Sequence, residues 1–247
     1  MPRPGTESMI DPENTIIVIP APMDSRLFPG KPMADLGGLP LVVRTLRQAA
    51  TAQLGPVLVA ASDHTLAEAV RRHGGDAIAT GVKRVPHYRR VAEALNMRDL
   101  QGAIEHVVVL PCDMPFVDLL SLRRCLAGLT NAQVEIATLA TPLHASEDAA
   151  DEAIAKVQAP LGNDRELAWA RGFPTRSESP TDLYEHIRIY ALRRGTLNKL
   201  AAASQVESLT SLAKALGIRI AAVKVDSKPF QVDTPAQLET ARRMLRD

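Results

Sequence analysis

Short apolar runs alternate with amphipathic helical patterns through the first 130 residues, and this alternation is the strongest constraint on the fold. Four runs have the composition of strands, at residues 15–20 (TIIVIP), 56–62 (PVLVAAS), 76–79 (DAIA) and 106–110 (HVVVL). Helical patterns separate and follow them, at residues 39–50, 63–75, 88–97 and 118–129. Continuous apolar strands are typical of parallel sheets that are covered on both faces. The alternation predicts an α/β protein with a doubly wound, mostly parallel sheet.

The pattern changes after residue 130. Strand-like segments follow one another without full crossover helices, at residues 134–143, 153–160 and 186–192. Two helical patterns and a late strand come next, at residues 195–205, 206–217 and 218–225. The last helix has a well-formed start, because Thr234 is an N-cap residue, Pro235 follows it and Gln237 completes a capping box. We expect a smaller mixed β lobe that extends the sheet.

One domain accounts for this organisation. We expect it to span residues 15–247, after a disordered leader at residues 1–14 that has no signal-peptide core. Its parts would be a ligand-binding half at 15–130, a β-rich lobe at 131–200 and a C-terminal part at 201–247 that returns to the sheet. No apolar segment approaches the roughly 18 residues of a membrane span.

Composition excludes several classes of function. The net charge of +1 does not favour a partner such as nucleic acid or an anionic membrane. Aromatic residues make up only 3% of the chain, which argues against stacking platforms for bases. Cys112 and Cys125 lack metal-ligand spacing, so we expect a reduced, cytoplasmic chain.

The loop after the first strand is unusually long for a βα turn. In open α/β sheets, ligands bind beyond the carboxyl ends of the strands. This loop carries Ser25, Arg26, Gly30 and Lys31, and the lysine can place a positive charge against a polyphosphate. The pattern is neither a Walker loop nor a dinucleotide fingerprint. On its own, a solvated basic loop explains it equally well.

Two aspartates stand at corresponding places in the chain. Asp113 follows the apolar run HVVVL and is flanked by Pro111 and Pro115, and Asp233 precedes the last helix. Two carboxylates at one sheet edge suit a hard divalent cation such as Mg²⁺. A turn role for Asp113, or a capping role for Asp233, is the alternative.

These motifs occur in the order that a known family has them. From residue 15 onward the chain resembles, as a divergent member, the bacterial 3-deoxy-manno-octulosonate cytidylyltransferases, or CMP-Kdo synthetases, within the nucleotidyltransferases. SRLFPGKPMADLGGLPLVVRTL is similar to the family's nucleotide loop and helix, and CDMP stands at its Gly-Asp-Glu-Pro turn. ELAWARGFPTR and HIRIYALRR are similar to its Tyr-Phe-Ser-Arg-Ala-Pro-Ile-Pro stretch and its His-x-Gly-x-Tyr strand. VDTPAQLETAR matches its Val-Asp-Thr-Pro-Glu-Asp-Leu ending.

The resemblance implies a fold, an activity and a set of site residues. The fold would be of the nucleotide-diphospho-sugar transferase type. The activity would be Mg²⁺-dependent transfer of a cytidylyl group from CTP to an acidic sugar, Kdo or a related one, for lipopolysaccharide or capsule synthesis. A homodimer is implied as well. Lys31 and Asp113 would be catalytic, and Asp113 and Asp233 would bind the metal. The implied nucleotide-binding residues are Pro20, Ala21, Ser25, Arg26, Lys31 and Arg90. The implied sugar-binding residues are Arg171, His186 and Tyr190.

The chain departs from the family in several signatures. Of Asp-His-x-Ser-Gly-Thr-x-Arg, aligned with residues 83–90, only Arg90 remains, and Pro86, His87 and Tyr88 replace Ser-Gly-Thr. A late helical Glu-x-Leu-Arg motif is also replaced. Two alternatives stay open: a nucleotidyltransferase with a different acceptor, or a catalytically impaired paralogue that binds nucleotide. The basic residues of this stretch could hold a sugar carboxylate or a phosphate, or be a solvated helix start. They are Lys83, Arg84, His87, Arg89 and Arg90.

Overall fold

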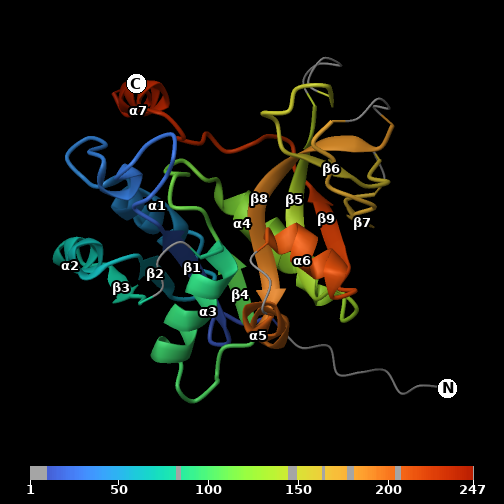
Figure 1. Ribbon diagram of the computed structural model, residues 1–247, viewed down its shortest axis with the longest axis horizontal. Coiled ribbons are helices and arrows are strands. Elements are labelled where there is room, and N and C mark those ends of the chain that lie inside the picture. Colours follow the sequence, from blue (N-terminus) through green and yellow to red (C-terminus); the bar gives the residue numbers. More distant parts are fainter. Residues whose placement is uncertain are drawn as a thin grey trace.

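A single mixed sheet organises the computed structural model, which describes residues 10–81, 85–143, 149–162, 165–176, 181–203 and 207–246. Its nine strands run in the order β3-β2-β1-β4-β8-β5-β9-β7, and β6 pairs with β8 (Figure 1). The strands are β1 (Thr15–Ala21), β2 (Val57–Ala61), β3 (Asp76–Ala79), β4 (His106–Val109), β5 (Ile136–Pro142), β6 (Lys156–Gln158), β7 (Leu167–Trp169), β8 (Leu183–Arg193) and β9 (Ile220–Lys224).

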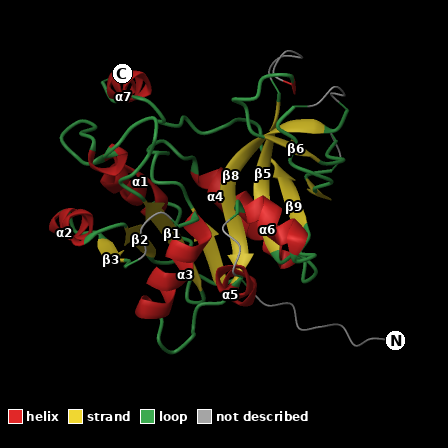
Figure 2. Ribbon diagram, viewed as in Figure 1, coloured by secondary structure: helices red, strands yellow, loops and turns green. Residues whose placement is uncertain are grey.

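Helices cover both faces of this sheet (Figure 2). One hydrophobic core joins the sheet to α1 (Leu41–Ala50), α2 (His64–Arg72) and α4 (Leu119–Ala127). A second core on the opposite face joins it to α3 (His87–Arg98), α5 (Arg194–Ala202) and α6 (Leu209–Ala215). The arrangement confirms the doubly wound α/β class. Among the described residues, no helix is both long and apolar enough to cross a membrane.

The central strand shows why a continuous apolar run predicted this architecture. All seven residues of β1 are buried. Ile17 and Ile19 belong to the first core, whereas Ile16 and Val18 belong to the second. Successive side chains of a strand point to opposite faces, so a strand covered on both faces needs apolar residues at every position.

The sheet is parallel on one side and mixed on the other. β1 pairs in parallel with β2 and β4, and β2 pairs in parallel with β3. Beyond β4, the long strand β8 runs antiparallel to both β4 and β5. β9 is parallel to β5, and β7 is antiparallel to β9. The mixed pairing was expected from the missing crossover helices, but the three-residue strand β7 was not.

The end of the chain returns to the first half of the molecule. After β9, residues 225–234 run along the top of the view in Figure 1, past the ends of the strands, to α7 (Pro235–Met244). We call residues 225–234 the crossing segment. Leu238 and Ala241 of α7 pack in one cluster with Leu41 at the start of α1 and with Leu36 in the loop before it. This crossing segment brings Asp233 to the loop after β1.

Candidate active site

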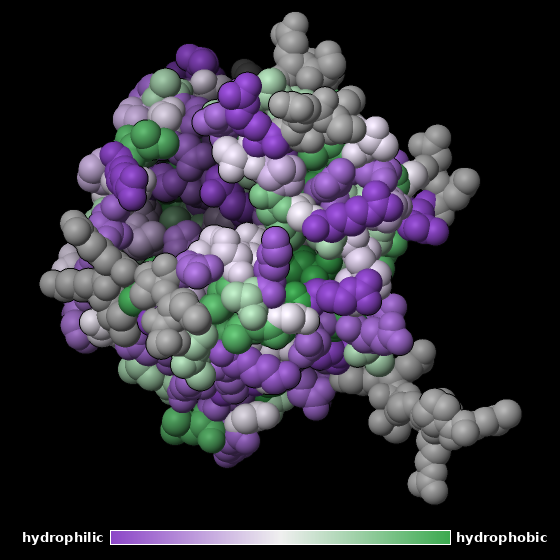
Figure 3. Space-filling model, turned by 45° about the vertical axis from the view of Figure 1, so that its right-hand side comes forward, coloured by the Kyte–Doolittle hydropathy of each residue, from purple (hydrophilic) through white to green (hydrophobic). Residues whose placement is uncertain are grey.

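A cavity of 620 Å³ opens where β1 and β4 end. Its walls come from the loop after β1, the turn after β4, the start of α3, the middle of β8, and the segments before α6 and α7. Figure 3 shows the molecule hollowed between its two halves, with hydrophilic residues along the border of the hollow. The carboxyl ends of parallel strands are where open α/β sheets bind ligands.

Lys31 is positioned by a short 3-10 helix, η1 (Lys31–Met33), in the loop after β1. Gly30 precedes it with a φ of 74°, a left-handed conformation that glycine adopts without steric cost. The Gly30 amide donates to the Met23 carbonyl at 2.9 Å and closes the loop. Only 7% of Lys31 is exposed, so the loop presents a buried ammonium group to the cavity.

Asp113 lies in the turn that follows β4. The Thr45 hydroxyl of α1 donates to the carbonyl of Cys112 at 2.9 Å. On the other side, the Val232 amide donates to the Asp113 carbonyl at 2.9 Å. The turn is therefore fastened to α1 and to the crossing segment, and the side chain of Asp113 is only 9% exposed.

Asp233 is fixed by the capping box of α7. Its amide donates to Gln237 Oε1 at 2.8 Å, and the Gln237 amide donates to the Thr234 hydroxyl at 3.2 Å. The side chain of Gln231 donates to Asp233 Oδ1 at 3.3 Å. The side chain of Asp233 is 39% exposed, more open to water than that of Asp113.

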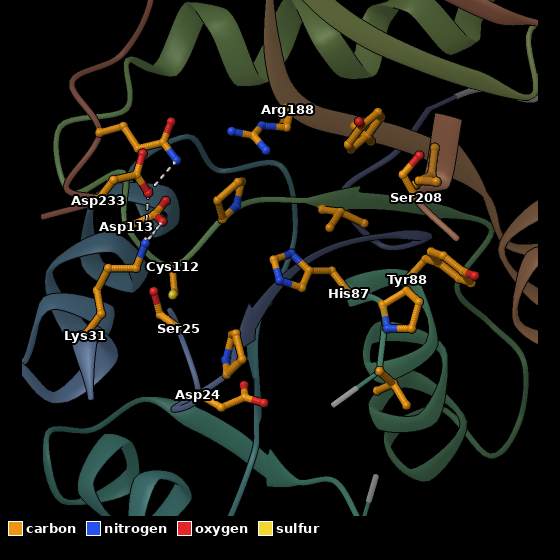
Figure 4. A pocket seen from close by; sticks show the side chains of 18 of the residues that line it. Asp24, Ser25, Lys31, His87, Tyr88, Cys112, Asp113, Arg188, Ser208 and Asp233 are labelled. Atoms are coloured by element: carbon orange, nitrogen blue, oxygen red, sulfur yellow. Dashed lines mark hydrogen bonds and ion pairs between the residues drawn. The ribbon is translucent and has the colours of Figure 1, made fainter. Parts of the chain in front are cut away.

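Lys31, Asp113 and Asp233 form a charge cluster (Figure 4). The Lys31 ammonium donates to Asp113 Oδ2, and it donates to Asp233 Oδ1 at 3.1 Å. Burial works to lower the pKa of Lys31, but the charges of the two aspartates, Asp113 foremost, outweigh it and raise that pKa. Lys31 therefore remains an ammonium group.

One oxygen of this cluster has no partner. Asp113 Oδ1 is buried and accepts no hydrogen bond from the described part of the chain. Leaving a buried carboxylate oxygen unsatisfied is costly, so such an atom indicates a site for a further ligand. Within the described ranges, no three acidic, histidine or cysteine side chains gather to hold a metal alone. The chemistry of the two aspartates suits Mg²⁺, which keeps waters and substrate phosphates among its ligands.

The opposite wall of the cavity carries His87, Arg188 and Tyr190. His87 is the first residue of α3, and its side chain lines the cavity. Desolvation by the surrounding protein lowers the pKa of His87. Arg188 and Tyr190 come from β8. Sequence reasoning missed Arg188, yet the signal was present, because Arg188 occupies the glycine place of His-x-Gly-x-Tyr.

A break in strand register lies at Arg188. Leu139 of β5 pairs with Ile187, but its neighbour Thr138 pairs with Tyr190. Arg188 and Ile189 therefore bulge out of the β5–β8 ladder. The Thr138 hydroxyl lies 3.1 Å from the carbonyl oxygen of Ile187 and 2.9 Å from that of Ile189, which stabilises the bulge. Bulges commonly re-aim side chains next to active sites.

The residues proposed from sequence fall into three groups. Ser25, Lys31, Asp113, Tyr190 and Asp233 line the cavity. Pro20 and Ala21 are buried at the end of β1, behind the lining.

Four other proposed residues lie away from the lining. Arg26 is exposed on the loop after β1. Arg90 is buried and donates to the Thr80 hydroxyl at 2.5 Å. Arg171 is exposed and pairs with Asp182 at 2.9 Å. His186 is buried behind Phe173, with ring centroids 4.9 Å apart.

His186 also differs from the rest in its ionisation. Burial first, and the charge of Arg188 second, lower its pKa to about 3, so the ring is neutral near pH 7. Its Nε2 atom lies 2.9 Å from the Thr138 hydroxyl. His186 thus supports the bulge from behind the cavity wall. Lys83 and Arg84, the remaining basic candidates, lie outside the described residues.

Thr45→Val tests how the Asp113 turn is held. The valine keeps the side-chain volume but leaves the Cys112 carbonyl without its donor, so the free energy of unfolding should fall by about 1–3 kcal/mol. Denaturant unfolding measures this. Thr51→Val, at an exposed threonine hydroxyl that donates to the Gln48 carbonyl, is the control and should change it by less than about 0.5 kcal/mol. Equal effects would show that Thr45 does not fasten the turn.

Comparison with known proteins identifies the family. Residues 16–231 match the cytidylyltransferase family. A 3-deoxy-manno-octulosonate cytidylyltransferase of Rhodopseudomonas palustris is 39% identical over 240 residues, covering 94% of this chain and 97% of the relative. The protein of the same name from Nitrobacter winogradskyi is 39% identical, with 94% of each chain covered.

Two solved structures have a similar fold. A CMP:2-keto-3-deoxy-manno-octonic acid synthetase complexed with CTP is 27% identical, with a TM-score of 0.80 over 94% of this chain and 98% of that chain. A 4-diphosphocytidyl-2C-methyl-D-erythritol synthase from Anaerococcus prevotii, 12% identical, shares the fold with a TM-score of 0.62 over 96% of this chain and 100% of that chain. The cavity at the strand ends and these likenesses agree, and the chain belongs to the cytidylyltransferase family, which makes it a nucleotidyltransferase.

Proposed function

We propose that this protein transfers the cytidylyl group of CTP to the anomeric hydroxyl of an acidic sugar of the 3-deoxy-manno-octulosonate (Kdo) class. The hydroxyl oxygen bonds to the α-phosphorus and its proton passes to solvent. The bond from the α-phosphorus to the bridging oxygen breaks, and the β- and γ-phosphates leave as pyrophosphate. The observation that carries the proposal is the cluster of Lys31, Asp113 and Asp233 in the cavity. The names of the relatives and the CTP complex of the solved structure support it.

The charges of the cluster fit a metal-triphosphate ligand. Asp113 and Asp233 would hold Mg²⁺, which neutralises phosphate charge and orients the groups that react. The raised pKa of Lys31 keeps its ammonium charged, so that it can contact phosphate oxygens once a ligand enters. Phosphoryl-type transfer depends mainly on positioning and on charge neutralisation, and these residues supply both.

The wider setting is part of the same proposal. A CMP-sugar of this kind would feed lipopolysaccharide or capsule synthesis in the cytoplasm, and the family resemblance supports a homodimer. Cys112 and Cys125 are both free thiols and both buried, as suits a reducing compartment. Burial also raises the pKa of each thiol, so neither is poised to act as a nucleophile.

Pyrophosphate release tests the proposed function directly. The purified protein is incubated with Mg²⁺, one of the four nucleoside triphosphates, and a panel of acidic sugars that includes Kdo. We expect release with CTP and a Kdo-class sugar, and none after EDTA is added. Release with CTP and another acceptor would shift the substrate class. CTP binding without any release would indicate an impaired paralogue and contradict the proposal.

A further inference from the structure

We infer that Arg188, together with His87, binds the carboxylate of the acceptor sugar. The inference rests on the proposed function and deepens it, because it assigns the acceptor's acid group to two side chains that the family resemblance did not supply. Arg188 is a specificity-determining residue in this view.

Arg188 is a cation without a partner among the described residues. Within the described ranges it makes no hydrogen bond and no ion pair, although it lines the cavity together with the acidic Glu207. Its guanidinium is a planar fork that matches the two oxygens of a carboxylate. The side chain is thus available to a bound anion at no cost in broken contacts.

The cavity separates this cation from the charge cluster. Figure 4 shows the Arg188 guanidinium and the His87 ring directed into the hollow, with Lys31 approaching from the opposite side. Lys31 is already neutralised by Asp113 and Asp233, and this cluster suits the metal and the phosphates. An anionic group of the acceptor would therefore bind at Arg188, whose positive charge is not neutralised by a carboxylate of the described residues.

The backbone directs Arg188 toward this place. β4 pairs with β8 only as far as Tyr190 and β6 pairs only with residues 183–185, so among the described residues no strand pairs with Arg188 on that side. On the other side, the bulge at Arg188 and Ile189 interrupts pairing with β5. The Thr138 hydroxyl and the buried His186 fill the space behind the bulge. The backbone position of Arg188 is fixed, because Thr138 and His186 are buried and hold the bulge in place.

Two independent replacements meet in this cavity. Arg188 stands at the glycine place of one family motif, and His87 at the glycine place of Ser-Gly-Thr. The two positions are 101 residues apart in the sequence, yet both side chains line the same hollow. An arginine and a histidine side chain stand where the family has glycine, so they narrow the cavity and add hydrogen-bond donors to it. The acceptor's carboxylate is the group for which that donor set is suited.

A cycle of binding measurements tests the inference. Kdo and its methyl ester, which lacks the carboxylate charge, are titrated by calorimetry into wild-type protein and Arg188→Ala, with CTP and EDTA present so that no turnover occurs. We expect Arg188→Ala to weaken Kdo binding by about 10- to 100-fold, the range for hydrogen bonds to charged groups. The ester should lose less than about twofold, because the two changes remove the same contact. His87→Ala should weaken Kdo binding by about 3- to 10-fold.

Further variants guard against trivial explanations. Arg188→Lys keeps the charge and should recover part of the affinity, whereas Arg188→Gly restores the family residue and should behave like Arg188→Ala. Arg72→Ala, at an exposed arginine at the end of α2 and away from the cavity, should bind Kdo as the wild type does. Unfolding midpoints confirm that each variant is folded.

Several outcomes would overturn the inference. Equal losses for Kdo and its ester, a loss of CTP affinity instead of Kdo affinity, or no Kdo binding by the wild type would each do so. Pyrophosphate release by the wild type judges the proposed function separately. Coupling between Arg188 and the carboxylate without any release would leave the anion site standing while the proposed function fails.

Discussion

Asp113→Ala should abolish cytidylyl transfer, lowering kcat by at least about 10³-fold, the upper range for losing one preorganised electrostatic group. The physical reason is that Asp113 is the buried member of the pair of carboxylates, and its Oδ1 accepts no hydrogen bond from the described residues and so is open to a ligand. The fold should survive, because Lys31 retains its ion pair with Asp233. Pyrophosphate release and denaturant unfolding measure the two effects.

The control for this prediction lies on the same crossing segment. Asp226 is 87% exposed and makes only a 3.7 Å ion pair with Arg124, so Asp226→Ala should leave kcat unchanged. Turnover by Asp113→Ala within about tenfold of wild type would show that the carboxylate does not take part. A collapsed fold, seen as a lost unfolding transition, would instead assign Asp113 a structural role.

Lys31→Met should have the second largest effect, and it should appear in two measurements. The kcat should fall by about 10²–10³-fold, because a charged donor to the phosphates is lost. The free energy of unfolding in EDTA should fall by about 3 kcal/mol, since Asp113 is left buried without its counter-charge. The methionine preserves most of the side-chain length, so packing changes little.

The same variant should respond differently to Mg²⁺. In the wild type, the ammonium occupies one oxygen of each aspartate, Oδ2 of Asp113 and Oδ1 of Asp233, so it competes in part with Mg²⁺ for the two carboxylates. Without the ammonium, Mg²⁺ alone should raise the Tm of Lys31→Met by more than it raises that of the wild type. Lys214→Met, at an exposed lysine of α6, serves as the control. An identical Mg²⁺ response in all three proteins would mean that the aspartates do not bind the metal.

The sequence was informative where a single physical rule decides the structure. Buried parallel strands need apolar residues throughout, so β1, β2 and β4 were predicted closely. Lys31 and Asp113 follow strands whose carboxyl ends meet at one edge, which is why they lie together. Asp233 was placed by the capping box of the last helix, a local signal that the structure reproduces. Their catalytic and metal-binding roles remain predictions.

Other features depend on contacts that no local pattern encodes. Three residues are too few for a period-two signal, so β7 was not expected. His186, Arg188 and Tyr190 alternate on one face of β8, but Phe173 covers His186 and leaves the other two at the cavity. Such packing between distant segments decided which of the proposed sugar-side residues reach the hollow. The bulge that re-aims Arg188 is likewise a property of the pairing between strands.

The crossing segment also determines at what stage of synthesis on the ribosome the candidate active site can form. Asp233 and the Val232 amide that fastens the Asp113 turn are made about 200 residues after Lys31. Domains generally begin to fold from their N-terminal part during synthesis. A nascent chain that ends before residue 232 can therefore form most of the sheet while its reaction centre is still incomplete. The reaction centre should therefore be complete only once residues 232 and 233 have been made and have reached Lys31 and Asp113.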